Sequence, residues 1–128
     1  MFANTKATNG FAVDDMEAAK KFYGETLGLG VTVLSEEFGV SSIQLAGGRD
    51  TVIYAKPDFV PATYTILNFE VDDVDAAVDE LSSKGVEVER YEGFEQDEKG
   101  IARGPGPSIA WFKDPAGNIL AVMHQPAD

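Results

Sequence analysis

The chain has 128 residues, 44% hydrophobic and 25% charged, which is typical of one soluble globular domain with a sizeable core. Only 10 Lys and Arg stand against 22 Asp and Glu, and this formal net charge of −12 argues against binding to the phosphates of nucleic acid. Cysteine is absent, which excludes disulfides and cysteine-ligated metals, and neither a membrane-spanning run nor a secretory signal is expected. These features together predict a cytoplasmic protein with no nucleic-acid or membrane partner.

The first half of the chain predicts the order β-α-β-β-β. A strand over residues 6–13 leads to a helix over 15–27, with Asp14 as its N-cap and Glu17 as the capping-box partner. Glycines end the helix. Three further strands are expected, over residues 31–35, 40–46 and 51–56.

A repeat shows that the second half follows the same plan. Residues 11–19, FAVDDMEAA, return as residues 69–77, FEVDDVDAA, with six of nine positions identical. A repeat of this kind indicates two copies of one structural unit. The sequence therefore predicts one domain, 1–128, built from module one (4–56), a proline-bearing linker (57–63) and module two (64–126).

Module two is expected to contain a strand over 64–71 and a helix over 73–84, with Asp72 as the cap and Asp75 as its partner. A long polar stretch, 92–107, is predicted to be a mobile loop that acts as a lid or a dimer contact. The remaining strands are expected over residues 86–91, 108–113 and 119–125, the last two joined by a turn at 114–118.

Alternation along the first strand of each module separates two faces. Phe11 and Val13, and in the second copy Leu67, Phe69 and Val71, are predicted to pack on the helices. The intervening residues should then look toward a concave side.

Three stretches of the chain carry a family resemblance. They are the first copy of the repeat with residues 22–29 (FYGETLGL), the second copy through Val86, and the closing segment 111–120 (WFKDPAGNIL). Together they resemble the vicinal oxygen chelate superfamily, which contains glyoxalase I, the extradiol dioxygenases and the bleomycin- and fosfomycin-resistance proteins. The resemblance implies an α+β fold of two tandem βαβββ modules, forming an open, incomplete mixed β-barrel with its helices outside. It also implies a small-molecule cavity and a homodimer.

Metal-dependent members of that superfamily carry His, Gln or Glu ligands, and the resemblance places the matching positions at Thr8, Ile66 and Ala121. None of these side chains holds a divalent ion strongly. We therefore expect no cofactor and no catalytic residue, and the sequence favours a protein that is not an enzyme. His124, the only histidine, is expected to be a structural residue at the end of a strand.

Candidate ligand-binding residues follow from the face and the chemistry of each side chain. Asn68 and Glu70 should point into the cavity, although a rim position for Glu70, in water or at a subunit contact, is the favoured alternative. Gln44 is either a polar anchor in the pocket or a solvent-facing strand residue. Arg103, in the loop, could clamp an anionic group or lie at the surface.

Aromatic side chains border the expected cavity and could stack on a planar ligand or simply pack in the core. They are Tyr54, Tyr91, Phe94 and Trp111.

The leading hypothesis is a metal-free binding protein, similar to the antibiotic-resistance members that sequester drugs, with an aromatic or cationic ligand. A second hypothesis is a metal-dependent glyoxalase-like lyase, isomerase or dioxygenase with displaced ligands, for which Glu70, Glu89, Gln44 and His124 are the available donors. A third is a regulatory module that acts through its dimer surface.

Overall fold

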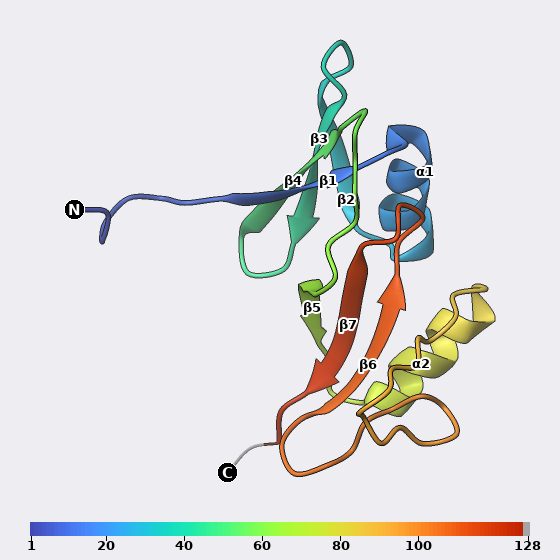
Figure 1. Ribbon diagram of the computed structural model, residues 1–128. Coiled ribbons are helices and arrows are strands. Elements are labelled where there is room, and N and C mark those ends of the chain that lie inside the picture. Colours follow the sequence, from blue (N-terminus) through green and yellow to red (C-terminus); the bar gives the residue numbers. More distant parts are fainter. Residues whose placement is uncertain (127–128) are drawn as a thin grey trace. The chain divides into compact units, whose positions relative to one another are not determined.

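The computed structural model describes residues 1–126, and the chain divides into two compact units, residues 1–61 and residues from Ala62 onward. Both units are α+β, and each contains one sheet that does not close on itself (Figure 1). None of the described helices has the length and apolar character needed to cross a membrane.

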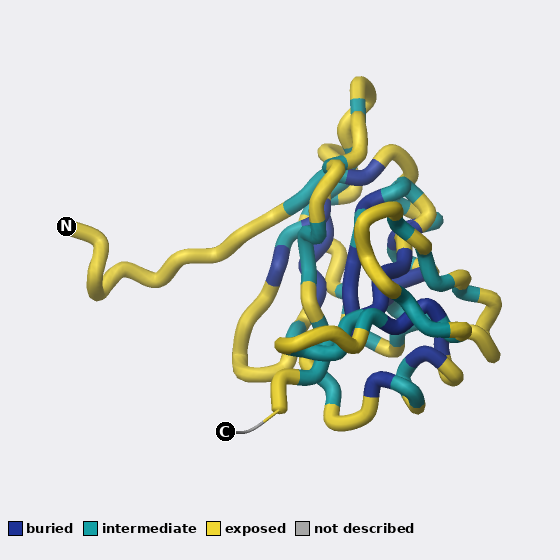
Figure 2. Tube along the Cα trace, turned by 60° about the horizontal axis from the view of Figure 1, so that its bottom comes forward, coloured by how far each residue is buried: buried dark blue, intermediate teal, exposed yellow. Residues whose placement is uncertain are grey.

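The first unit contains a four-stranded sheet in the order β1-β4-β3-β2. Strands β1 and β4 are parallel, and the other pairs are antiparallel. Its elements are β1 (Asn9–Val13), α1 (Met16–Lys21), the π-helix η1 (Phe22–Thr26), β2 (Gly30–Ser35), β3 (Val40–Leu45) and β4 (Arg49–Ala55). Residues 1–10 are exposed along their whole length (Figure 2).

The second unit contains a three-stranded sheet in the order β5-β7-β6, with β5 parallel and β6 antiparallel to the central β7. The helix α2 contacts β6 and β7. Its elements are β5 (Thr65–Glu70), α2 (Val74–Ser83), β6 (Ser108–Lys113) and β7 (Ile119–His124).

The predicted strand over 86–91 is wrong: only an isolated bridge between Val88 and Phe112 forms there. The backbone N–H of Glu89 still donates to Trp111 O, at 2.8 Å. Two residues later, however, the N–H of Tyr91 donates to the side-chain oxygen of Gln96, so pairing with β6 stops. A side chain takes the hydrogen bond that a strand would have used.

Both helices begin one residue later than the sequence predicts. Asp15 and Asp73, rather than Asp14 and Asp72, are extended and accept hydrogen bonds from the third helical N–H, at 3.2 Å and 3.1 Å. This is the geometry of an N-cap, which satisfies an otherwise unpaired helical donor. The predicted partner Asp75 is therefore not in the capping-box position and is available for other contacts.

The predicted helix over 15–27 also changes type along its length. From Phe22 it widens into a π-helix, in which Leu27 N–H donates to Phe22 O at 2.9 Å. Phe22 and Tyr23 lie in this turn, and the Tyr23 ring is fully buried against Phe11, with 5.8 Å between ring centroids. Phe11 thus packs on the helical side, as the alternation predicted.

One face of the second sheet is covered by α2 and the other is not. Leu120 and Phe112, which lie opposite one another in β7 and β6, are buried on the covered face. Asn68 and Glu70 are exposed on the other face of β5. Side chains in register with these two residues therefore point away from α2.

Candidate functional site

A cleft of about 460 Å³ opens on the second unit, and we call it the aromatic cleft. Four of its lining side chains are aromatic, and one is acidic. The lining residues are Thr63, Tyr64, Thr65, Tyr91, Glu92, Phe94, Trp111 and Ile119.

Trp111 of β6 lies at the base of the aromatic cleft and is only 9% exposed. In the sheet it stands beside Ala121 of β7, which in turn stands beside Asn68 of β5. This row lies on the face of the sheet on which Asn68 is exposed, opposite the face that carries Phe112 and Leu120. The sheet therefore presents the large indole on its helix-free side.

Two rings from the loop after α2 lie against this tryptophan. Tyr91 meets it edge-on, with ring centroids 5.6 Å apart and an interplanar angle of 81°. Phe94 is tilted by 52° with centroids 5.0 Å apart, and 56% of Phe94 remains exposed. Such geometries are favourable for aromatic pairs, and the exposed part of Phe94 leaves ring surface available for a ligand.

The Tyr91 hydroxyl is buried and has no hydrogen-bond partner among the described residues. Burial raises the pKa of this phenol, and the nearby Glu89 carboxylate raises it further. The group thus stays protonated at neutral pH and can donate a hydrogen bond.

The loop that carries Tyr91 and Phe94 is held by the side-chain amide of Gln96. Its oxygen accepts from Tyr91 N–H at 2.8 Å, and its nitrogen donates to the backbone oxygens of Glu89 and Gly100, at 2.9 Å and 2.8 Å. One side chain thereby satisfies three backbone groups that no strand pairs.

Ion pairs attach the same loop to α2. Arg103 donates to Asp97 in the loop at 2.9 Å and to Asp75 on the helix at 2.6 Å. The guanidinium lowers the pKa of both carboxyls, chiefly through these hydrogen bonds. Arg103, predicted as a possible clamp for anions, lies outside the aromatic cleft and is engaged in these contacts. The loop predicted to be mobile is therefore tied down at its middle.

The other predicted site residues are distributed over both units. Asn68 and Glu70 are exposed on the helix-free face of the second sheet, but neither lines the aromatic cleft. Gln44 and Tyr54 are exposed on the first sheet, and the Gln44 amide lies over Gly30, where a Cβ would collide with it. Of the predicted ligand-binding residues, Tyr91 and Trp111 are brought together in the cleft.

Most residues at the site were not among the predicted ligand-binding set, and Tyr64, Glu92 and Gln96 are three of them. Tyr64 and Glu92 each stand at the edge of an expected strand, where sequence does not show which way a side chain points. Gln96 lies in a stretch without periodicity. Only the hydrogen bonds of the folded loop identify its role.

The positions at which relatives hold a metal do not fit a metal here. Thr8 is exposed ahead of β1, Ile66 lies at an irregularity in the register of β5, and Ala121 is fully buried. The side chains of Ile66 and Ala121 have no donor atom. His, Asp and Glu residues within 1–126 also form no group of three or more suited to a metal ion. His124 lies at the end of β7, with Nδ1 3.0 Å from Val71 O.

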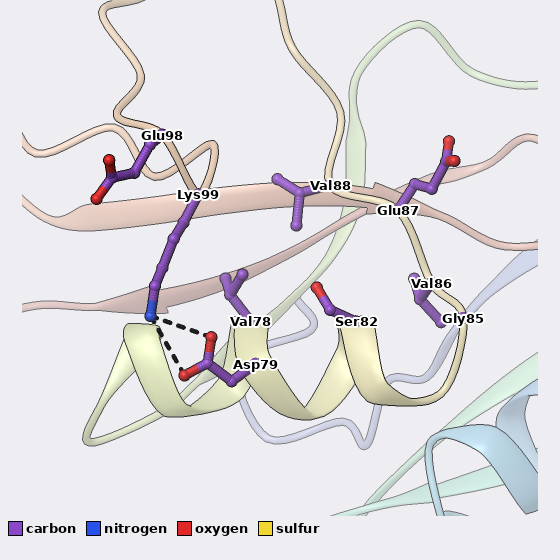
Figure 3. A pocket seen from close by; sticks show the side chains of 9 residues that line it. All are labelled: Val78, Asp79, Ser82, Gly85, Val86, Glu87, Val88, Glu98 and Lys99. Atoms are coloured by element: carbon purple, nitrogen blue, oxygen red, sulfur yellow. Dashed lines mark hydrogen bonds and ion pairs between the residues drawn. The ribbon is translucent and has the colours of Figure 1, made fainter.

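A second concavity, of about 610 Å³, lies between α2 and the segments on either side of the loop (Figure 3). Val78 and Val88 form apolar parts of it, and Lys99 reaches across to both carboxylate oxygens of Asp79, at 3.0 Å and 3.2 Å (Figure 3). The charged groups at this end already satisfy each other. In addition, no aromatic side chain is among the residues that line this groove, in contrast to the aromatic cleft.

Comparisons with known proteins agree with this architecture. The family model of the Glyoxalase/Bleomycin resistance protein/Dioxygenase superfamily matches residues 7–122. None of the curated proteins matches the chain significantly.

Solved structures match nearly the whole chain. TnmS3, an antibiotic binding protein from Streptomyces sp. CB03234, is 26% identical, with a TM-score of 0.71 over 96% of this chain and 98% of its own. A superfamily member from Sphaerobacter thermophilus DSM 20745 is 21% identical, with a TM-score of 0.70 over 94% and 98%. A lactoylglutathione lyase from Agrobacterium tumefaciens is 19% identical, with a TM-score of 0.69 over 95% of each chain. The last two likenesses concern the fold alone.

Proposed function

Because the chain belongs to the glyoxalase/bleomycin resistance protein/dioxygenase superfamily, we propose that it is a small-molecule binding protein that holds an aromatic or cationic compound in the aromatic cleft. The observation that carries this proposal is the gathering of Tyr91 and Phe94 around Trp111, at centroid distances of 5.6 Å and 5.0 Å. The largest apolar side chain of the unit lies at the base of a concave site with few polar groups. This is the usual composition of a ligand pocket.

Stacking explains how such a site would gain affinity without catalysis. Each aromatic pair contributes about 0.5–1.5 kcal/mol beyond the burial of its area. Phe94 is more than half exposed, so a planar ligand laid against it and Trp111 would bury ring surface that now faces solvent. Because the loop bonds of Gln96 are already made, little ordering is needed on binding.

Sequestration of an antibiotic is the specific role we propose for this binding, in a cytoplasmic homodimer. The likeness to TnmS3, itself an antibiotic binding protein, supports it. The lack of metal-binding side chains also supports it, because Ile66 and Ala121 occupy positions where a metal-dependent relative would need ligands. A protein that protects by binding needs only affinity and sufficient copies.

A direct test uses the fluorescence of Trp111, the only tryptophan of the chain. We expect aromatic antibiotics in a compound panel to quench or shift its emission and to raise the melting temperature. Phe94→Ala should weaken binding several-fold while the protein stays folded, because this ring is largely exposed.

The matched control is Phe38→Ala, an exposed phenylalanine of the first unit that lies outside the aromatic cleft. It should leave the affinity unchanged. If no compound perturbed Trp111, or if both variants weakened binding equally, the aromatic cleft would not be the binding site.

A further inference from the structure

We propose that the aromatic cleft selects positively charged ligands, either an organic ammonium group or a cationic aromatic ring, and rejects anions. This inference rests on the proposed function, because it assigns a charge preference to the same site. Three features support it: the lining of the cleft, the state of every Lys and Arg in this unit, and the acidic residues left over.

The lining offers a charged partner for a cation and none for an anion. Glu92 is its single charged residue, and the remaining members are aromatic, hydroxyl-bearing or aliphatic. The faces of aromatic rings carry negative electrostatic potential, which attracts ammonium and guanidinium groups. A cation resting on Trp111 and Phe94 would therefore meet ring faces, with a carboxylate nearby.

Every Lys and Arg of the second unit already has an acidic or backbone partner, so an anion would have to compete with that partner. Four of them form ion pairs, and Arg90 donates to the backbone oxygens of Asp97 and Glu98, at 3.0 Å and 2.8 Å. The pairs are Lys84–Glu80 at 3.4 Å, Lys99–Asp79 at 3.0 Å, Arg103–Asp75 at 2.6 Å and Lys113–Glu89 at 3.4 Å.

Lys113 is the cation closest in sequence to Trp111, and both side chains lie on the same face of β6. Its ammonium is paired with Glu89, and the charges of both groups act on the Tyr91 phenol. An anionic ligand would have to separate this pair. A cationic ligand leaves it intact.

In contrast, two acidic groups in the segment that carries Phe94 are without ion pairs among the described residues. They are Glu92 and Glu95, and both are exposed. The chain as a whole has a net charge of −12. The long-range field and the local contacts thus both favour a positively charged ligand, and the field increases its rate of encounter as well as its affinity.

The test compares three bicyclic probes of similar shape: 1-methylquinolinium, quinoline at pH 8, where it is uncharged, and 1-naphthoate. Each is titrated into the full chain while the indole N–H signal of Trp111 is followed by NMR, which gives one unambiguous peak. Glu92→Gln removes the acidic group of the cleft. Glu87→Gln, in the groove of Figure 3, is the matched control.

We expect 1-methylquinolinium to bind roughly tenfold more tightly than quinoline, with 1-naphthoate weakest. Glu92→Gln should reduce the affinity for 1-methylquinolinium roughly threefold and leave the affinity for quinoline unchanged. The control variant should change neither affinity. Added salt should reduce the preference.

The two proposals fail in different ways. Equal affinity for the three probes, or tighter binding of the anion, would overturn the charge preference and leave the proposed function standing. If no probe shifted the Trp111 signal, the binding site itself would be wrong, and both proposals would fall.

Discussion

Phe94 rests on Trp111 with 5.0 Å between ring centroids, although the two belong to a loop and a strand that do not pair along this stretch. The contact depends on how the loop is tied, first by Gln96 and then by Arg103. The shape of the aromatic cleft is thus set by polar side chains that do not line it.

Replacing Gln96 with Ala should destabilise the protein by about 1–3 kcal/mol, because three partly buried backbone groups lose their partner. Urea unfolding, followed by circular dichroism, measures this change. The emission of Trp111 should also move to longer wavelength as the loop opens. Gln44→Ala is the control, since Gln44 is an exposed strand residue, and an equally large effect there would contradict this role of Gln96.

Arg103→Gln should loosen the loop with little change in global stability. The guanidinium and its partners are between 32% and 43% exposed, and pairs open to solvent contribute little to the free energy of unfolding. Hydrogen exchange at Lys99 and Ile101, whose N–H groups donate to Asp97, should increase. Lys20→Gln, which removes an ion pair with Glu17 in the first unit, should not affect those amides.

Acid should release the same loop. Arg103 lowers the pKa of Asp75 and Asp97 in the folded protein, so both carboxyls favour folding above their ordinary pKa of about 3.9. That contribution is lost as the pH falls through the lowered folded-state values. We expect limited proteolysis within 92–103 to begin below about pH 4. Cleavage at the same rate at pH 7 and pH 3 would contradict this, and Arg103→Gln should show a weaker pH dependence.

Tyr91→Phe should leave the protein as stable as the wild type or increase its free energy of unfolding by up to about 1 kcal/mol, because the buried hydroxyl has no hydrogen-bond partner within residues 1–126. The raised pKa of this phenol favours the folded state below the ordinary value of about 10, and the benefit is lost as pH rises through the folded-state value. Alkaline unfolding should therefore be less steep in the variant. A marked loss of stability would mean that the hydroxyl has a partner in solution.

Elemental mass spectrometry of protein purified without chelator or affinity tag should find only traces of divalent metal, because Ile66 and Ala121 supply no ligand atom. Chelator should leave the melting temperature unchanged. About one ion per chain would contradict this and favour the rival lyase or dioxygenase activity, with Glu70 as the first residue to examine.

Most of the fold could be predicted from the repeat, because residues 11–19 and 69–77 indicate the same strand, helix and cap in both units. The caps were predicted one residue too early, because two adjacent aspartates are equally suited to the role in sequence. Only the extended backbone of Asp15 and Asp73 distinguishes them. The strand at 86–91 is expected because module two repeats the order of module one, and that order does not show whether a neighbouring strand pairs with it.

The sequence predicts those site residues whose chemical type alone suggests a role. Tyr91 and Trp111 were identified because large aromatics in strands are candidates for stacking. The role of Arg103 was not, because its partner Asp75 lies on a distant helix and no local pattern links them. Contacts between segments far apart in sequence depend on the folded chain.

In each unit the first strand pairs in parallel with the last, β1 with β4 and β5 with β7. Neither sheet can therefore be completed until the final strand of its unit has been synthesised. The sheet of the first unit can be completed once residue 55 has left the ribosome. The sheet of the second unit requires β7, its central strand, which is synthesised last. A chain stopped before Ile119 would leave β5 and β6 without a common neighbour, and their unpaired edges would be open to association with other chains.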